Sequence, residues 1–240
     1  MNQQVSELIN LLKKDSTRLL ILFSVILLVF EFFGWQRPFH DLFRQADFYR
    51  SLNLNNRHFY AQAYTTLNFL IWFVGLPLLF HLIFPIKDSQ AYGLGYDKNK
   101  VKLGIYLVIA AVMVPVTFVA STSPNFYKFY PLYQPRAVAD WLSFEAIYMV
   151  QFFCVEFFFR GFGLYRLEKL VGEHAIALMT LPYALLHIHK PFPEAIGSIF
   201  AGLVLGHLSL KGKSIWPGVF LHMLIALSAD TFGLYHRGWF

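Results

Sequence analysis

The sequence predicts an all-α fold, a polytopic membrane bundle of about seven spanning helices whose C-terminal members form a polar cavity. Hydrophobic residues make up 57% and charged residues 14% of the 240 residues, whereas soluble domains hold about 45–50% and about 25%. Uncharged runs of roughly 15 to 25 residues recur from Leu19 onward, and about 20 apolar residues let a helix cross a bilayer. The single Cys154 excludes an internal disulfide and a multi-cysteine metal cluster.

The apolar runs place the elements in order. After a short interfacial helix within residues 1–18, we expect spanning helices at 19–33, 62–85, 102–120, 141–163, 175–189, 194–210 and 214–233. The first run has the length of a signal-peptide core, but no small-residue cleavage site follows it, so we expect a retained helix. The last three runs are short and contain Gly, His and Pro, which favours packing around polar groups inside the bundle.

The loops and charges complete this organisation. Loops 35–60 and 121–140 are rich in aromatic residues, which is typical of chain at headgroup level. We divide one membrane domain into N-terminal spanning helices with interfacial loops (1–140) and a C-terminal core (141–240). The net charge of +6 comes from cations dispersed between apolar runs, which indicates contact with membrane lipids and excludes nucleic acid as the expected partner. A cytoplasmic N-terminus would put twelve Lys and Arg on the cytoplasmic side and eight opposite, a small excess in the direction of the positive-inside rule.

Ionisable residues inside apolar runs carry the functional information, because each costs several kcal/mol unless it is paired or hydrated. They are Glu31, Glu145, Glu156, Arg160, His187, His207, His222 and Asp230. We expect Glu31, Glu145 and His207 to reach the membrane interface from near the ends of their helices.

The remaining groups fall on three neighbouring short helices. Glu156 and Arg160 stand four residues apart, which suits a buried ion pair, and His222 taken alone suits a core histidine bonded to a carbonyl. Glu194 follows two prolines at the start of a helix, where a carboxylate also suits the helix dipole. Taken together, a carboxylate, an arginine and two histidines can activate water and stabilise an oxyanion. Glu156, His187 and His222 would alternatively bind zinc with an open fourth position.

Four segments carry a family resemblance: Glu156-Phe-Phe-Phe-Arg160-Gly161, then Tyr183 to His187, then Gly202-Leu-Val-Leu-Gly206, then Ser214-Ile-Trp-Pro-Gly-Val-Phe-Leu-His222. Their order and spacing resemble the CAAX-protease and bacteriocin-processing family of intramembrane endopeptidases, over about residues 141–233. In that family Glu-Glu-x-x-x-Arg, Phe-x-x-x-His and His-x-x-x-Asn/Ser motifs surround water in a membrane cavity.

This chain departs from the family motifs at three positions. Val155 stands at the first Glu, Tyr183 at the Phe, and Ala226 at the Asn or Ser that follows the second His. We expect Glu194 to replace the missing base, and Lys190 or Asp230 to replace the missing polar partner.

The resemblance implies a peptidase that needs no cofactor, in which Glu156 or Glu194 activates water with His187. His222 then stabilises the oxyanion and Arg160 anchors Glu156. Its implied substrates are membrane-associated or lipidated peptides, and we expect a bacterial plasma membrane. The alternatives are a noncatalytic binding or immunity-type membrane protein, favoured by Val155 and Ala226, a zinc-dependent membrane protease, and a small transporter. The sequence predicts neither the substrate's identity nor the oligomeric state.

Overall fold

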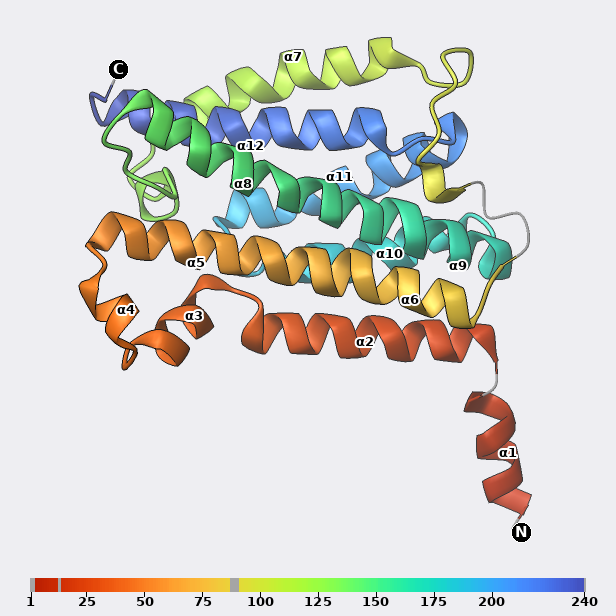
Figure 1. Cartoon of the computed structure of the whole chain (residues 1–240). Coiled ribbons are helices and arrows are strands. Elements are labelled where there is room, and N and C mark those ends of the chain that lie inside the picture. Colours follow the sequence, from red (N-terminus) through yellow and green to blue (C-terminus); the bar gives the residue numbers. More distant parts are fainter. Residues whose placement is uncertain (1–2, 13, 87–90, 240) are drawn as a thin grey trace.

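The computed structural model describes residues 3–12, 14–86 and 91–239, and within these ranges the chain is helical without a strand (Figure 1). The helices are α1 (Gln3–Leu12), α2 (Asp15–Phe33), α3 (Gln36–Phe43), α4 (Asp47–Ser51), α5 (Leu54–Phe69), α6 (Leu76–Ile83), α7 (Leu103–Ala120), α8 (Val138–Glu156), α9 (Leu164–Val171), α10 (His174–Leu185), α11 (Phe192–Gly212) and α12 (Trp216–His236). Six stretches are long and apolar enough to cross a membrane, and α10 is a shorter apolar helix. The all-α membrane bundle is therefore confirmed.

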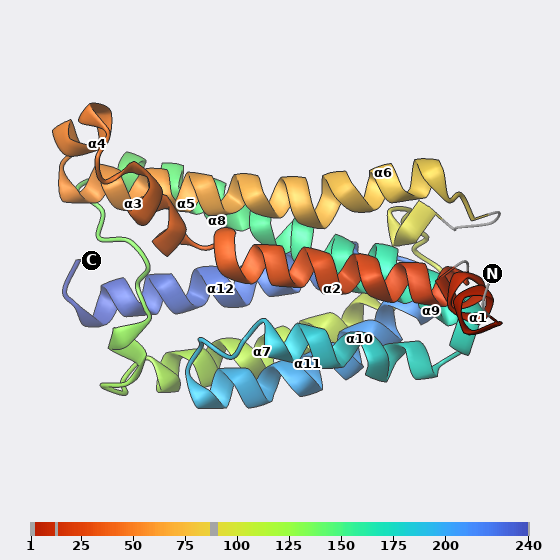
Figure 2. The same cartoon turned by 90° about the horizontal axis from the view of Figure 1, so that it is seen from below.

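One long helix runs through the middle of the bundle. α8 continues through a π-helical segment, Phe157–Gly163, into α9, and these 34 residues form the most buried of the spanning stretches. α5 packs along α8, while α10 and α11 pack against the π-helical segment from the other side, and α7 lies against α12 (Figures 1 and 2). The segment that carries Glu156 and Arg160 is thus surrounded by protein rather than by lipid.

Aromatic packing and small residues hold this arrangement together. The rings of Phe30, Phe69, Phe73 and Phe158 form a chain with centroid separations of 4.3 to 4.9 Å. Their tilted, edge-on and stacked pairs add to the stability of an aromatic core. A Cβ on Gly202 would lie 2.7 Å from the Thr180 side chain. Only glycine at this position therefore lets α11 approach α10 so closely.

The predicted spans appear in the expected order, and six of the seven are long enough to cross a membrane. Their extents differ from the prediction. The second begins eight residues earlier, at Leu54, and the fourth continues from Gly163 to Val171 because the π-helical turn keeps the helix intact. The predicted span 175–189 is a 12-residue helix that ends at Leu185. A turn follows it because Pro191 and Pro193 favour ending one helix and starting the next.

The three residues expected at the interface behave differently. Glu31 is partly exposed and accepts hydrogen bonds from Trp35 and His189, and His207 is exposed on α11. The expectation for Glu145 is wrong, because its side chain is buried next to Asp230 on α12. The long loop before α8 folds back over this end of the bundle and covers it.

Candidate active site

A buried ion pair lies at the junction of α8 and its π-helical continuation. Arg160 Nη1 lies 3.2 Å from Glu156 Oε1, and the two side chains are only 3% and 1% exposed. His222 Nδ1 on α12 lies 2.9 Å from the same carboxylate oxygen, so the imidazole donates to it. Charge-assisted bonds of this kind hold a carboxylate ionised away from water, and the second oxygen, Oε2, has no hydrogen-bond partner among the described residues.

Local backbone features place this group. π-helical turns are rare and recur at functional sites, and here the turn begins directly after Glu156. Gly218 on α12 faces the carboxylate, since a Cβ there would lie 3.3 Å from Glu156 Oε2. The Arg160 guanidinium sits 3.6 Å from the centroid of the Tyr183 ring, a cation–π contact that ties α10 to the pair.

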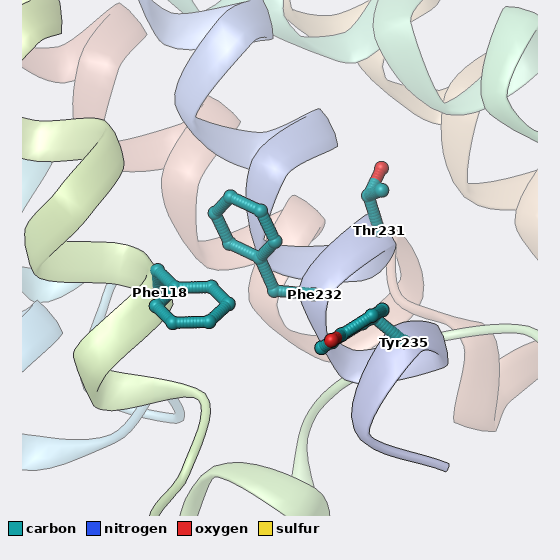
Figure 3. A pocket seen from close by; sticks show the side chains of 4 residues that line it. All are labelled: Phe118, Thr231, Phe232 and Tyr235. Carbon is teal, nitrogen blue, oxygen red and sulfur yellow. The ribbon is translucent and has the colours of Figure 1, made fainter. Parts of the chain in front are cut away.

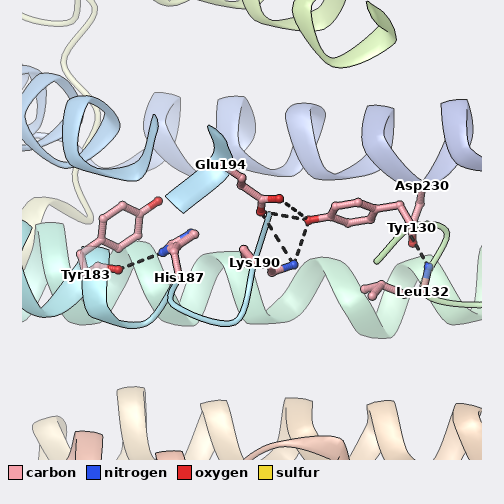
Figure 4. Close-up of polar contacts among 7 residues, drawn as sticks. All are labelled: Tyr130, Leu132, Tyr183, His187, Lys190, Glu194 and Asp230. Carbon is pink, nitrogen blue, oxygen red and sulfur yellow. Dashed lines mark hydrogen bonds and ion pairs between the residues drawn. The ribbon is translucent and has the colours of Figure 1, made fainter. Parts of the chain in front are cut away.

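His187 occupies the turn after α10, next to Tyr183. Its Nδ1 lies 2.9 Å from the carbonyl oxygen of Tyr183 (Figure 4). A carbonyl only accepts, so Nδ1 carries a proton and the neutral ring presents Nε2 as an acceptor. The centroid of the Tyr183 ring lies 4.6 Å from that of His187 and 6.3 Å from that of His222. The structure thus brings Glu156, His187 and His222 together from α8, the turn after α10, and α12.

Glu194 belongs to a second, neighbouring cluster in the same row of polar side chains (Figure 4). The Tyr130 hydroxyl lies 2.9 and 3.0 Å from its two carboxylate oxygens, and Lys190 Nζ lies 2.8 Å from the same hydroxyl. Lys190 also approaches Glu194 Oε1 to 3.8 Å. Unlike Glu156, the Glu194 side chain is 35% exposed, so water can reach it.

Asp230 supports the loop rather than the first cluster. Its Oδ1 accepts a hydrogen bond of 3.0 Å from the backbone N–H of Leu132, and Glu145 is its carboxyl neighbour. Ala226 lies one turn earlier on α12, buried against an aromatic cluster that includes Phe152. It therefore offers no polar group to the site.

Part of the chain is similar to a known protein family. Residues 137–236 match the family model described as type II CAAX prenyl endopeptidase Rce1-like. This segment is an Rce1-like domain. Its family is one of peptidases. The segment contains the seven site residues predicted from the sequence, which are Glu156, Arg160, His187, Lys190, Glu194, His222 and Asp230. No curated protein and no solved structure matched the chain.

The Rce1-like domain confirms the family resemblance and, with six apolar helices in the structure, makes the chain an integral membrane protein. Among the described residues, no three His, Cys, Asp or Glu side chains converge as metal ligands would. Glu156, His187 and His222 thus do not form a ready zinc site in this arrangement. The choice between carboxylate and zinc chemistry stays a prediction.

Two surface pockets are lined by residues other than the polar side chains drawn in Figure 4. One, of about 260 Å³, is lined by Phe118, Thr231, Phe232 and Tyr235 (Figure 3). The other, of about 460 Å³, also lies between α7 and α12 and is lined mainly by apolar residues. Both pockets are lined mainly by apolar side chains, on helices that carry many exposed apolar residues. Such pockets suit the binding of lipid chains, and they lack the polar groups that hydrolysis of a peptide bond needs.

Two tyrosines of the candidate site do not follow from the sequence. In the motif Tyr183 is only a substitute for Phe, yet its ring contacts Arg160 and its carbonyl orients His187. Tyr130 precedes the matched segment, in the aromatic loop before α8, and nothing in its spacing connects it with Glu194, 64 residues later. Its aromatic neighbours indicated an interfacial loop, and only the fold brings it to the carboxylate.

Proposed function

We propose that this protein is an intramembrane endopeptidase that hydrolyses a peptide bond of a membrane-associated or lipidated substrate near the membrane surface. One observation carries the proposal. Within the Rce1-like segment, Glu156, His187 and His222 come from α8, the turn after α10, and α12 to one buried place. We further propose a bacterial plasma membrane as its location and membrane lipids as its surroundings.

The proton from water would pass to His187. Its neutral ring offers Nε2 as an acceptor, because Nδ1 donates to a carbonyl. Of the two candidate carboxylates, exposure favours Glu194 as the one that binds and orients the water, since the Glu156 side chain is almost fully buried. The hydroxide then adds to the substrate carbonyl carbon, and the proton held on His187 goes to the leaving amine.

Glu156 acts through its partners in this scheme. It accepts from His222 Nδ1 and so orients the ring, and in the imidazolium form the opposite Nε2–H can donate to the oxyanion. Arg160 keeps Glu156 ionised and in place. We assign to Lys190, whose Nζ lies 2.8 Å from the Tyr130 hydroxyl, the role of the polar partner that Ala226 does not supply.

The test is cleavage of a library of membrane-tethered peptides by purified protein in nanodiscs. Glu194→Gln and His187→Ala remove the groups assigned to water, and His207→Ala changes an exposed histidine of α11 as a matched control. We expect cleavage to be lost in the first two variants and kept in the third. Cleavage that persists in Glu194→Gln would overturn the role of Glu194, and cleavage that persists in His187→Ala would overturn the mechanism.

A noncatalytic membrane binding protein is the second candidate, and a specific observation favours it. Val155 is buried where the resembling family has its first Glu, and Ala226 is buried where it has an Asn or Ser. Such a protein would cleave nothing while folded, and it would retain its partner when Glu194 and His187 are both neutralised. A zinc protease would lose cleavage with a chelator and recover it with Zn²⁺.

A further inference from the structure

The Tyr130 hydroxyl connects Lys190 with Glu194. Tyr130 is buried, and its single proton can go to one acceptor. A lysine ammonium only donates, so Lys190 donates to the phenol oxygen and the phenol donates to Glu194. The direction of both hydrogen bonds is therefore fixed, and the carboxylate receives a donor shared between its two oxygens at 2.9 and 3.0 Å.

Hydrogen bonds and close packing fix the loop that carries Tyr130 against one face of α12 and against the C-terminal end of that helix. Asp230 accepts from the N–H of Leu132, and Arg237 Nη2 lies 2.8 Å from the carbonyl oxygen of Tyr127. Between them, a Cβ on Gly233 would lie 2.8 Å from the backbone nitrogen of Pro131. Positions 230, 233 and 237 are spaced so that they share one helix face. This face therefore contacts the loop both before and after Tyr130.

We propose that Tyr130 is a positioning residue that fixes the orientation of the Glu194 carboxylate, so that the loop before the Rce1-like segment completes the site. The inference rests on the proposed function, in which Glu194 orients the water. Without the phenol, the polar contact left to Glu194 among the described residues is Lys190 Nζ, 3.8 Å from Oε1.

The electrostatics of the loop agree with this role. Burial, with Glu194 nearby, raises the pKa of Tyr130 well above its usual range, so the phenol remains a neutral donor at every assay pH. The other titratable groups that face it are Lys190 from the turn before α11, Tyr148 from α8 and Asp230 from α12. Lys190 is the only cation among them, and the phenol oxygen accepts from it.

Tyr130→Phe tests the inference, because it removes the hydroxyl and leaves the ring packed on Phe126. Tyr127→Phe in the same loop is the matched control. A hydrogen bond to a charged group contributes enough that its loss should lower kcat about tenfold or more. KM should stay within about twofold, because the phenol contacts the carboxylate and not the peptide.

Infrared spectroscopy of the resting protein separates this inference from the proposed function. The carboxylate stretching bands are recorded in the intact protein, and subtraction of the Glu194→Gln spectrum isolates those of Glu194. We expect the Glu194 bands to shift in Tyr130→Phe, because the carboxylate loses its phenol donor, and to stay unchanged in Tyr127→Phe. This expectation holds whether or not the wild type cleaves peptide, so a lack of cleavage would count against the endopeptidase alone. Glu194 bands at the same position in the wild type and both variants would overturn the role of Tyr130.

Discussion

Replacing Arg160 with Met leaves the Glu156 carboxylate buried with His222 as its single donor. The pair is separated by 3.2 Å with both side chains almost unexposed, so at the effective dielectric constant of about 20 that suits protein sites the attraction is about 5 kcal/mol. Desolvation offsets part of this gain, and removing one partner of a buried pair typically costs about 3 to 5 kcal/mol. We expect Arg160→Met and Glu156→Gln each to lower the free energy of unfolding by that amount.

The assay is equilibrium unfolding in mixed micelles with increasing SDS, followed by tryptophan fluorescence. In a double-mutant cycle, Glu156→Gln with Arg160→Met should lose less than the sum of the single variants by at least about 2 kcal/mol. The matched control is the exposed pair Asp97 and Lys100, 3.4 Å apart, whose cycle should be additive because solvent screens exposed pairs. Additivity at Glu156 and Arg160 within about 0.5 kcal/mol would refute a pair that holds the site together.

Three further predictions concern the chemistry, the loop and the helix packing. Strong chelators should leave peptide cleavage unchanged, and a loss that Zn²⁺ reverses would instead support the zinc alternative. Asp230→Ala should speed amide hydrogen exchange at Leu132, whereas Asp230→Asn keeps the accepting oxygen and should not. Gly202→Val should lower the free energy of unfolding by about 1 to 3 kcal/mol, because the new side chain collides with Thr180. Thr180→Ala in the same chain should restore part of that loss. Equal stability of the wild type and Gly202→Val would contradict the close packing of α10 and α11.

Much of the fold could be predicted because the bilayer imposes a simple rule on the sequence. Apolar runs of sufficient length must become helices, since no water is present to satisfy the backbone. The predicted order of spans follows directly from this. Helix ends were less predictable: α5 begins at Leu54 among polar residues, and the π-helical turn after Glu156 has no signature in hydropathy.

The candidate site was predictable where sequence distance is short or a motif is present. Glu156 and Arg160 contact each other because they share a helix face, and the motif order of the second half indicated that His187 and His222 come near them. Contacts made by loop closure gave no such signal. Tyr130 reaches Glu194, and Glu145 becomes buried, only because the loop before α8 folds over the end of the bundle.

The shortness of α10 has a consequence for the bilayer itself. Twelve helical residues span about 18 Å, whereas the hydrocarbon layer is about 30 Å thick. If His174 lies at one surface, the turn with His187 lies well inside the layer, at a depth set by the length of this helix. Lipids with shorter or longer acyl chains would move the opposite surface relative to that turn. Membrane thickness therefore determines the distance between the headgroups of that surface and His187, which the scissile bond must cover.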